Sequence, residues 1–231
     1  MARPIALVID DEEQIRRVVR HALSEDFPKV LEADTGAAGI DLAAAEAPDL
    51  IVLDLGLPDT SGIAVCLEIR KWSAAALIVL SARHADGEKI AMLDAGADDY
   101  VTKPFSTLEF KARVRALLRR SATRDAGSGT TIHCGALKMD LTARTLSLSD
   151  ATVHVTPTEW ELLRVLITHA GKTMTHRQLF TKVWPARSEG DAQQYLRVHV
   201  ANLRRKIEPN PIDPRYILTE PGVGYRFAAC D

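Results

Sequence analysis

Five short apolar runs recur along the first half of the chain, and their alternation with helical patterns constrains the fold more than any other feature. The runs occupy residues 5–9, 30–33, 50–53, 77–80 and 100–102. Helical patterns follow four of them, and the first places five apolar residues on one face: Ile15, Val18, Val19, Ala22 and Leu23. Runs that are apolar at every position suit strands buried on both faces, as in a parallel sheet covered by helices. We therefore predict an α/β domain, a doubly wound five-stranded parallel sheet, over residues 1–120.

A polar joint separates this domain from a second one. The sequence SATRDAGSGT at 121–130 lacks apolar periodicity and is rich in small residues, which is typical of a linker. Short alternating stretches at 131–155 then predict a small antiparallel sheet. Helix start signals at Thr156 and Thr175 and a helical pattern at 191–207 precede an expected terminal hairpin at 216–228. Together these elements predict a winged helix-turn-helix domain over residues 131–231.

The composition of the 231-residue chain excludes several classes of protein. It is 46% hydrophobic and 26% charged, which is ordinary for a globular protein and argues against disorder. No apolar stretch reaches the roughly 18 residues of a membrane span and no signal peptide is recognisable, so we expect a cytoplasmic protein that does not bind membranes. The cysteines Cys66, Cys134 and Cys230 are widely spaced, so we expect reduced thiols and no structural zinc.

Charged and hydroxyl side chains lie at the ends of the predicted strands. Asp10 and Asp11 follow the first strand, Asp54 the third, Ser81 the fourth and Lys103 the fifth. Ligands of doubly wound sheets bind at the carboxyl ends of the strands, so we expect these side chains to meet there. A single Asp after a strand more often caps the next helix, but three carboxylates at one edge repel one another and favour a hard divalent cation. The sequence therefore predicts a Mg²⁺ site.

Four motifs in the first domain resemble those of two-component response-regulator receivers, whose fold is flavodoxin-like. The motifs are IDDEE at 9–13, PDLIVLDLGLPDTSG at 48–62, LSAR at 80–83 and GADDYVTKPF at 96–105. The resemblance implies that Asp54 accepts a phosphoryl group from a sensor histidine kinase, and that Lys103 and Ser81 bind phosphoryl oxygens. It also implies a set of Mg²⁺ ligands: Asp10, Asp11, Asp54 and the carbonyl of Gly56. Phosphoryl transfer needs an in-line nucleophile and cations near the equatorial oxygens, and this set would supply both.

The same resemblance implies a switch and a dimer surface. Ser81 would move toward the phosphoryl group and Tyr100 would rotate into the vacated space, although Tyr100 alone is typical of a packed aromatic residue. Receivers of the OmpR/PhoB subfamily form a two-fold dimer through oppositely charged pairs, as an isologous interface requires. The pairs expected here are Lys89 with Glu109, Asp99 with Arg113 and Asp98 with Arg120.

A basic stretch of the second domain ends in the helix predicted at 191–207. Residues 164–206 carry nine basic residues against Glu189 and Asp191, which fits a polyanion partner, although basic faces are often only solvated. Four apolar residues at helical spacing fix the buried face of this helix: Leu196, Val200, Leu203 and Ile207. The residues expected to contact a DNA major groove or its phosphates are Gln194, Tyr195, Arg197, Val198, Asn202, Arg204 and Arg205.

The second domain also resembles a known family over its whole length. The segments TPTEWELLRVL, THRQLFTKVW, YLRVHVANLRRKIE and PGVGYRF resemble the effector domain of the OmpR/PhoB subfamily, and within it the potassium-transport regulators. Pro221 stands where several relatives have a wing arginine. Contacts of the wing with the DNA backbone are therefore expected from Thr219 and Arg226.

These features together predict a transcription factor controlled by phosphorylation. Phosphorylated Asp54 would favour receiver dimers, which place two winged helices on tandem half-sites of promoter DNA about one helical turn apart. One alternative is a phosphatase with Asp54 as nucleophile and the second domain as a cap, but such enzymes have a second acid where this chain has Gly56. Another alternative is a DNA-binding regulator whose receiver dimerises without phosphorylation.

Overall fold

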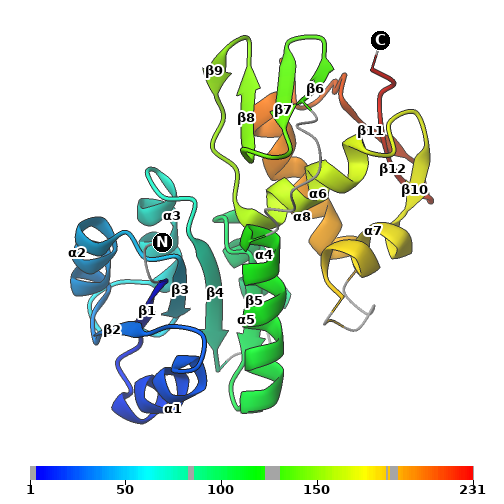
Figure 1. The fold of residues 1–231 in the computed structure, drawn as a ribbon. Coiled ribbons are helices and arrows are strands. Elements are labelled where there is room, and N and C mark those ends of the chain that lie inside the picture. Colours follow the sequence, from blue (N-terminus) through cyan, green and yellow to red (C-terminus); the bar gives the residue numbers. More distant parts are fainter. Residues whose placement is uncertain (1–3, 83–85, 123–130, 186, 188–191, 231) are drawn as a thin grey trace. The chain divides into compact units, whose positions relative to one another are not determined.

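The computed structural model describes residues 4–82, 86–122, 131–185, 187 and 192–230, with only the backbone described at 86 and 119–122. The chain divides into two compact units, Met1–Leu118 and Arg119–Asp231 (Figure 1). Most of the predicted linker at 121–130 lies outside the described residues. Within the described part of the chain, no helix is both long and apolar enough to cross a membrane.

The first unit is built on a five-stranded parallel sheet in the order β2-β1-β3-β4-β5. Its strands are β1 Ile5–Ile9, β2 Lys29–Ala33, β3 Leu50–Asp54, β4 Ala76–Ser81 and β5 Asp99–Thr102. Its helices are α1 Glu13–Leu23, α2 Gly36–Glu46, α3 Gly62–Arg70, α4 Asp86–Asp94 and α5 Thr107–Ala122. The predicted doubly wound α/β fold is confirmed.

The apolar runs form strands because each run buries two faces at once. In β1, Ala6 and Val8 belong to one hydrophobic cluster, whereas Leu7 and Ile9 belong to another. Residues of α1 and α5 complete the first cluster, and residues of α2, α3 and α4 complete the second. Because alternate side chains of a strand point to opposite faces, consecutive apolar residues are what a sheet covered on both sides requires.

The second unit holds two small antiparallel sheets and three helices. One sheet has the order β6-β7-β8-β9, and the other has the order β10-β12-β11. The strands are β6 Thr131–Cys134, β7 Leu137–Asp140, β8 Thr145–Leu148, β9 Ala151–Thr152, β10 Thr173–Thr175, β11 Ile217–Glu220 and β12 Gly224–Phe227. The helices are α6 Pro157–Ile167, α7 His176–Val183 and α8 Ala192–Ile207. This is the predicted winged helix-turn-helix architecture.

Local signals account for where two of these helices begin. The Thr156 hydroxyl accepts a hydrogen bond from the amide of Glu159, whose carboxylate accepts one from the Thr156 amide at 2.8 Å. Thr175 and Gln178 form the same reciprocal pair at the start of α7. Such capping boxes satisfy amide groups that lack a partner within the helix, so both predicted helix starts are confirmed.

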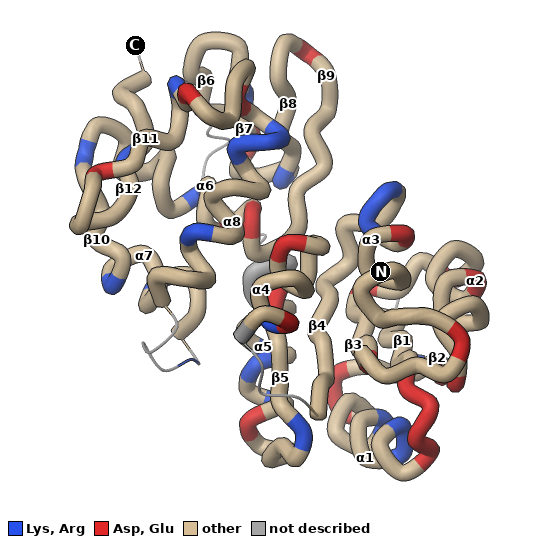
Figure 2. The backbone as a smooth tube through the Cα atoms, turned by 180° about the vertical axis from the view of Figure 1, so that it is seen from behind, with Lys and Arg blue, Asp and Glu red and all other residues tan. Residues whose placement is uncertain are grey.

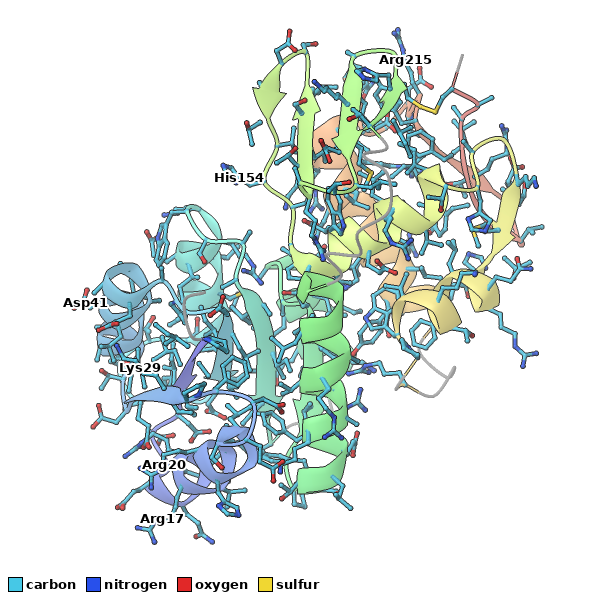
Figure 3. The ribbon with its side chains drawn as sticks, viewed as in Figure 1. Arg17, Arg20, Lys29, Asp41, His154 and Arg215 are labelled. Atoms are coloured by element: carbon cyan, nitrogen blue, oxygen red, sulfur yellow. A yellow bond between two sulfur atoms is a disulfide. The ribbon has the colours of Figure 1, made fainter. Side chains whose placement is uncertain are left out.

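The cysteine prediction is wrong for two of the three residues. Cys134 at the end of β6 and Cys230, three residues beyond β12, form a disulfide, drawn in yellow in Figure 3. Their separation of 96 residues gave no sequence signal, because only the fold brings the two Cα atoms to 4.8 Å. The remaining cysteine, Cys66, is free, as expected, and the structure shows that it is buried.

Candidate functional site

Lys103 joins the acidic side chains at the carboxyl edge of the first sheet. Its ammonium Nζ lies 2.8 Å from Asp10 Oδ2, 2.7 Å from Asp54 Oδ1 and 3.1 Å from Glu12 Oε1. The acidic residues that lead from β1 into α1 form a continuous red segment in Figure 2. The predicted meeting of Asp10, Asp54 and Lys103 is therefore confirmed. Glu12, within the IDDEE motif, joins them as a partner that the sequence reasoning did not single out.

A cavity of about 480 Å³ opens beside this cluster. The predicted residues Asp11, Asp54, Gly56, Ser81 and Lys103 all line it. The remaining lining residues are Glu12, Leu55, Ser61, Gly62, Ile63, Ala82 and Glu88. Asp54 is 5% exposed and Ser81 is 2% exposed, so both present little more than one edge to the cavity. A small anionic group could approach Asp54 from this side.

The loop after β3 holds Asp54 tightly. Asp54 Oδ2 accepts a hydrogen bond from the Gly56 amide at 2.5 Å. Gly62 begins α3 directly against the strand end, and a Cβ at this position would lie 2.4 Å from the backbone oxygen of Asp54. In the same loop, Asp59 accepts hydrogen bonds from the amides of Gly36 and Ala37 and so caps α2. The backbone thus restrains the Asp54 carboxylate independently of any ligand.

Burial and ion pairing shift the pKa values of Asp10 and Lys103 in opposite directions, and a different one of the two effects prevails at each residue. Burial raises the pKa of Asp10, only partly offset by its hydrogen bond to Lys103. Burial alone would lower the pKa of Lys103, but hydrogen bonds to Asp10 and Asp54 raise it above its ordinary value. Lys103 is therefore cationic at any physiological pH, and the buried Asp10 carboxylate is incompletely compensated.

The oxygen donors of this edge fit a hard divalent cation. Asp11 and Asp54 line the cavity together with Gly56, and carboxylate and carbonyl oxygens are the ligands that Mg²⁺ prefers. The incompletely compensated Asp10 carboxylate beside them also favours added positive charge. Among the described residues, no three His, Cys, Asp or Glu side chains are already arranged around one metal position, and Lys103 bridges Asp10 and Asp54.

The structure places Tyr100 in the interior. Its side chain is 5% exposed and packs in the hydrophobic cluster to which α2, α3 and α4 contribute residues. Ser81 ends β4 at the neighbouring position of the sheet, since Val79 pairs with Tyr100 and Ser81 with Thr102. The two predicted switch residues therefore lie on adjacent strands, two residues apart in register.

The residues expected at a dimer surface pair largely within their own chain. Asp98 has no exposed surface and binds Arg70 Nη2 at 2.9 Å and the Leu77 amide at 3.0 Å. Asp98 is thus inaccessible to a second chain in this structure, which corrects its predicted pairing; the side chain of Arg120 lies outside the described residues. Arg113 pairs with Glu109 and lies 3.6 Å from Asp99. Lys89, on α4, completes the predicted set.

The predicted DNA-contacting helix is α8. Its four predicted core residues are buried, at 1% exposure or less: Leu196, Val200, Leu203 and Ile207. Tyr195 is also fully buried against Phe180 and Trp184, so its predicted contact with DNA is wrong. The reason is that α7 packs on α8 and widens the buried face. Val198 and Asn202 are 7% and 6% exposed, whereas Arg197 and Arg205 are exposed and Gln194 is half-buried.

The hairpin after α8 is tied to the helix by two charged side chains. Arg204 donates to the Ile217 carbonyl from Nε at 3.0 Å and from Nη2 at 2.6 Å, and to Thr219 Oγ1 at 2.8 Å. The Glu208 carboxylate accepts hydrogen bonds from the amides of residues 215–217 at 2.7–3.1 Å. Arg226 pairs with Glu220 across the hairpin. Arg204 therefore positions β11, a role that the sequence reasoning did not assign to it.

Comparison with known families agrees with both halves of this geometry. Residues 6–115 match the response regulator receiver domain, and residues 150–227 match the C-terminal domain of transcriptional regulatory proteins. The chain is 46% identical over 221 residues to the KDP operon transcriptional regulatory protein KdpE of Escherichia coli, covering 96% of this chain and 97% of that protein. The chain belongs to the response regulators of the OmpR/PhoB type.

Other relatives of this response regulator support the same assignment. KdpE of Mycobacterium tuberculosis is 46% identical over 226 residues, 97% of this chain and 99% of that protein. Among solved structures, the response regulator DrrB of Thermotoga maritima, described as an OmpR/PhoB homologue, is 33% identical with a TM-score of 0.53, covering 99% of this chain and 100% of that one. The relatives are transcriptional regulators, so the second unit is a DNA-binding effector domain and not the cap of a phosphatase.

Proposed function

We propose that this response regulator is switched by phosphorylation of Asp54 by a sensor histidine kinase of the KdpD-like type. The observation that carries the proposal is the position of Lys103 Nζ, 2.7 Å from Asp54 and beside an open cavity. A phosphoryl group on Asp54 would place new negative charge next to a fixed cation, which is the electrostatic requirement of phosphoryl transfer. Ser81 lines the same cavity and has a hydroxyl that can donate to a phosphoryl oxygen.

Mg²⁺ would be held by Asp10, Asp11, Asp54 and the carbonyl of Gly56, and would supply charge neutralisation at the phosphoryl oxygens. The chain's own residues prepare this step. The Gly56 amide restrains one carboxylate oxygen of Asp54, and Lys103 bonds to the other. When the phosphoryl group occupies the cavity, Lys103 would transfer its hydrogen bond from Asp54 to a phosphoryl oxygen. Ser81 would then follow toward that group, and the neighbouring Tyr100 would respond through their adjacent strands.

The first experiment measures the phosphorylation of Asp54 directly. Intact-mass spectrometry of the full chain with acetyl phosphate and Mg²⁺ should show one added phosphate, lost in Asp54→Asn. The control is Asp34→Asn, because Asp34 also follows a strand of the sheet but does not line the cavity. An adduct that persists in Asp54→Asn would contradict the proposal.

We propose further that phosphorylation promotes a homodimer that binds tandem half-sites in promoter DNA. The exposed basic side chains of α8, including Arg197 and Arg205, and the hairpin residues Thr219 and Arg226 would contact the duplex. Gln194, Val198 and Asn202 remain proposed neighbours of the base edges, whereas Arg204 acts through Thr219 and β11. The similarity to KdpE makes a potassium-uptake operon the proposed target.

The second experiment tests dimer formation and DNA binding together. When a phosphodonor is added, sedimentation should show a larger fraction of dimer, and DNA titration should show a higher affinity for the promoter. The shift should be lost in Asp54→Asn. An unchanged promoter affinity and monomer–dimer equilibrium in that variant, with the phosphodonor present, would favour a phosphorylation-independent regulator. Genomic footprinting would identify the operon, and the absence of sites near potassium-uptake genes would contradict that part.

A further inference from the structure

The disulfide of the effector domain joins two segments that are far apart in the sequence. Cys134 ends β6, in the four-stranded sheet, and pairs in register with Leu137 of β7. Cys230 follows β12, the central strand of the sheet that forms the wing. The bond therefore links the two sheets of the domain, and it encloses α6, α7 and α8 within its loop of 96 residues.

Noncovalent contacts hold the segment before Cys230 in place without the bond, β6 is held by its pairing with β7, and Tyr216 lies between the two segments. The Ala228 amide donates to the Tyr216 carbonyl at 2.8 Å, and the Phe227 carbonyl accepts from the Gly171 amide at 2.9 Å. The Tyr216 ring stacks on Phe227 with centroids 6.1 Å apart. The Tyr216 hydroxyl also reaches the β6–β7 turn, where it would lie 3.5 Å from a Cβ at Gly135. Reduced thiols would therefore stay close together, so the bond can re-form.

The two sulfur atoms differ in accessibility. Cys134 is 4% exposed, whereas Cys230 is half-buried. Thiol–disulfide exchange needs an attacking thiolate to reach one sulfur along the line of the S–S bond. Attack is therefore expected at Cys230, with Cys134 as the leaving sulfur. Cys66 takes no part, because burial raises the pKa of its thiol to about 11 and keeps it protonated.

We propose that Cys134 and Cys230 are a reversible thiol–disulfide site, through which small thiols and disulfides of the glutathione class set the stability of the DNA-binding domain. In reduction, one thiolate attacks Cys230 Sγ, forming a mixed disulfide and releasing the Cys134 thiolate, which takes up a proton. A second thiol then breaks the mixed disulfide, leaving two protein thiols and one oxidised small-molecule disulfide. Oxidation is the reverse, with the small disulfide as the electron acceptor.

The stability effect follows from chain entropy. A cross-link over a long loop restricts the unfolded ensemble more than the folded one. The loop here spans most of the effector domain and does not enter the receiver, so the effect should be confined to the effector domain. The state of the pair does not depend on Asp54, so this inference stands or falls separately from the phosphorylation proposal.

The test equilibrates the full chain in glutathione buffers of increasing oxidised fraction, then traps thiols with an alkylating agent under denaturing conditions. Intact mass should change from three alkylated thiols to one as the buffer becomes oxidising. Cys134→Ser should take up one glutathione, located at Cys230 by peptide mapping. The effector domain should melt roughly 5–10 °C lower when reduced.

Control variants keep the proposal falsifiable. The double variant Cys134→Ser/Cys230→Ser should melt like the reduced protein and ignore the buffer, and Cys230→Ser alone serves if the double variant does not fold. Cys66→Ala should retain the full response, because its position lies in the receiver core. Three alkylated thiols in every buffer, a bond that resists every reducing buffer, or equal melting of the two forms would each overturn the proposal.

Discussion

At the scale of single residues, the proposed phosphoryl-acceptor site is organised around one lysine. Lys103 bonds to Asp10 and Asp54 before any ligand arrives, so part of the acidic charge is already compensated where we propose that the phosphoryl group binds. The sequence could predict these three residues because parallel strands bring their carboxyl ends to one edge. It could not predict that Glu12 also pairs with Lys103 or that Glu88 lines the cavity, because both depend on how the first turns of helices are oriented.

The raised pKa of Asp10 gives a prediction about stability and pH. The folded chain binds this proton more tightly than the unfolded chain, so the free energy of unfolding falls as pH rises from 3.8 through the folded-state pKa and stays reduced above it. Asp10→Asn removes that cost. We expect it to raise the melting temperature of the receiver at pH 7 without Mg²⁺ by a few degrees, since about 1 kcal/mol shifts the melting temperature of a domain of about 100–150 residues by about 4 °C.

Calorimetry of wild type and Asp10→Asn between pH 5 and 8 would check this expectation. Mg²⁺ should raise the melting temperature of wild type more than that of the variant, because a ligand stabilises the state that binds it. Asp34→Asn, which changes an exposed acid outside the cavity, should leave the melting temperature nearly unchanged. A lower melting temperature for Asp10→Asn would show that its bond to Lys103 outweighs the cost of burial.

At the scale of elements, two charged side chains connect α8 to the wing. Arg204 binds the Ile217 carbonyl and Thr219, and Glu208 binds three successive amides that lead into β11. Because a carboxylate that accepts several amide hydrogen bonds is a strong local restraint, Glu208 determines where the hairpin leaves the helix. The orientation of the wing relative to the proposed DNA-contacting helix thus depends on residues that do not themselves contact DNA.

Glu208→Gln should weaken this connection. The amide side chain keeps one acceptor oxygen and loses the charge, so we expect a loss of about 1–3 kcal/mol in the free energy of unfolding of the effector domain. DNA affinity should fall more than the stability loss explains, because the wing would be less well positioned. Denaturant unfolding and DNA titration measure the two effects. Asp213→Asn is the matched control, since Asp213 is exposed in the same loop; an equal effect there would contradict the assigned role.

Most helices and strands could be predicted from the sequence. The elements that could not be predicted were missed for physical reasons. The βα alternation and the capping boxes at Thr156 and Thr175 located the main helices and strands. Helix α4 was not predicted, because it begins with Asp86 and Gly87 and its apolar residues, 90–93, are consecutive and show no helical spacing. Strand β10 has only three residues and exists through pairing with β12, where a Cβ at Gly224 would lie 2.0 Å from the Met174 oxygen. Such an element is defined by its partner and not by its own pattern.

At the scale of the whole molecule, the two halves of the chain carry net charges of opposite sign. Residues 1–120 carry 15 Lys and Arg against 20 Asp and Glu, whereas residues 121–231 carry 14 against 11. The acidic excess belongs to the unit that would attract a cation, and the basic excess belongs to the unit that would attract DNA. Because both are in one chain, dimerisation of the receivers would raise the local concentration of a second effector domain at the promoter.

The spacing of the half-sites tests this coupling. Half-sites about one helical turn apart should bind the phosphorylated protein cooperatively, because the α8 helices of the two chains then lie on the same side of the duplex. Inserting about five base pairs, which is half a turn, should abolish the cooperativity and leave binding to each half-site. DNA titration with phosphodonor would measure it, with Asp54→Asn as the control. Equal affinity for both spacings would show that receiver dimers do not organise the effector domains.

Gly62 lies outside the proposed chemistry and yet touches it, since it has no room for a methyl group beside the backbone oxygen of Asp54. A library of substitutions would therefore show two neighbouring positions that tolerate almost nothing, for unrelated causes. Substitutions at Asp54 would yield folded proteins that do not respond to the phosphodonor. Substitutions at Gly62 would push the strand end away from the helix and lower the yield of folded protein. Measuring the abundance of each variant before its signalling would separate these two causes. A position that only lacks room for a side chain would then not be mistaken for one that takes part in phosphorylation.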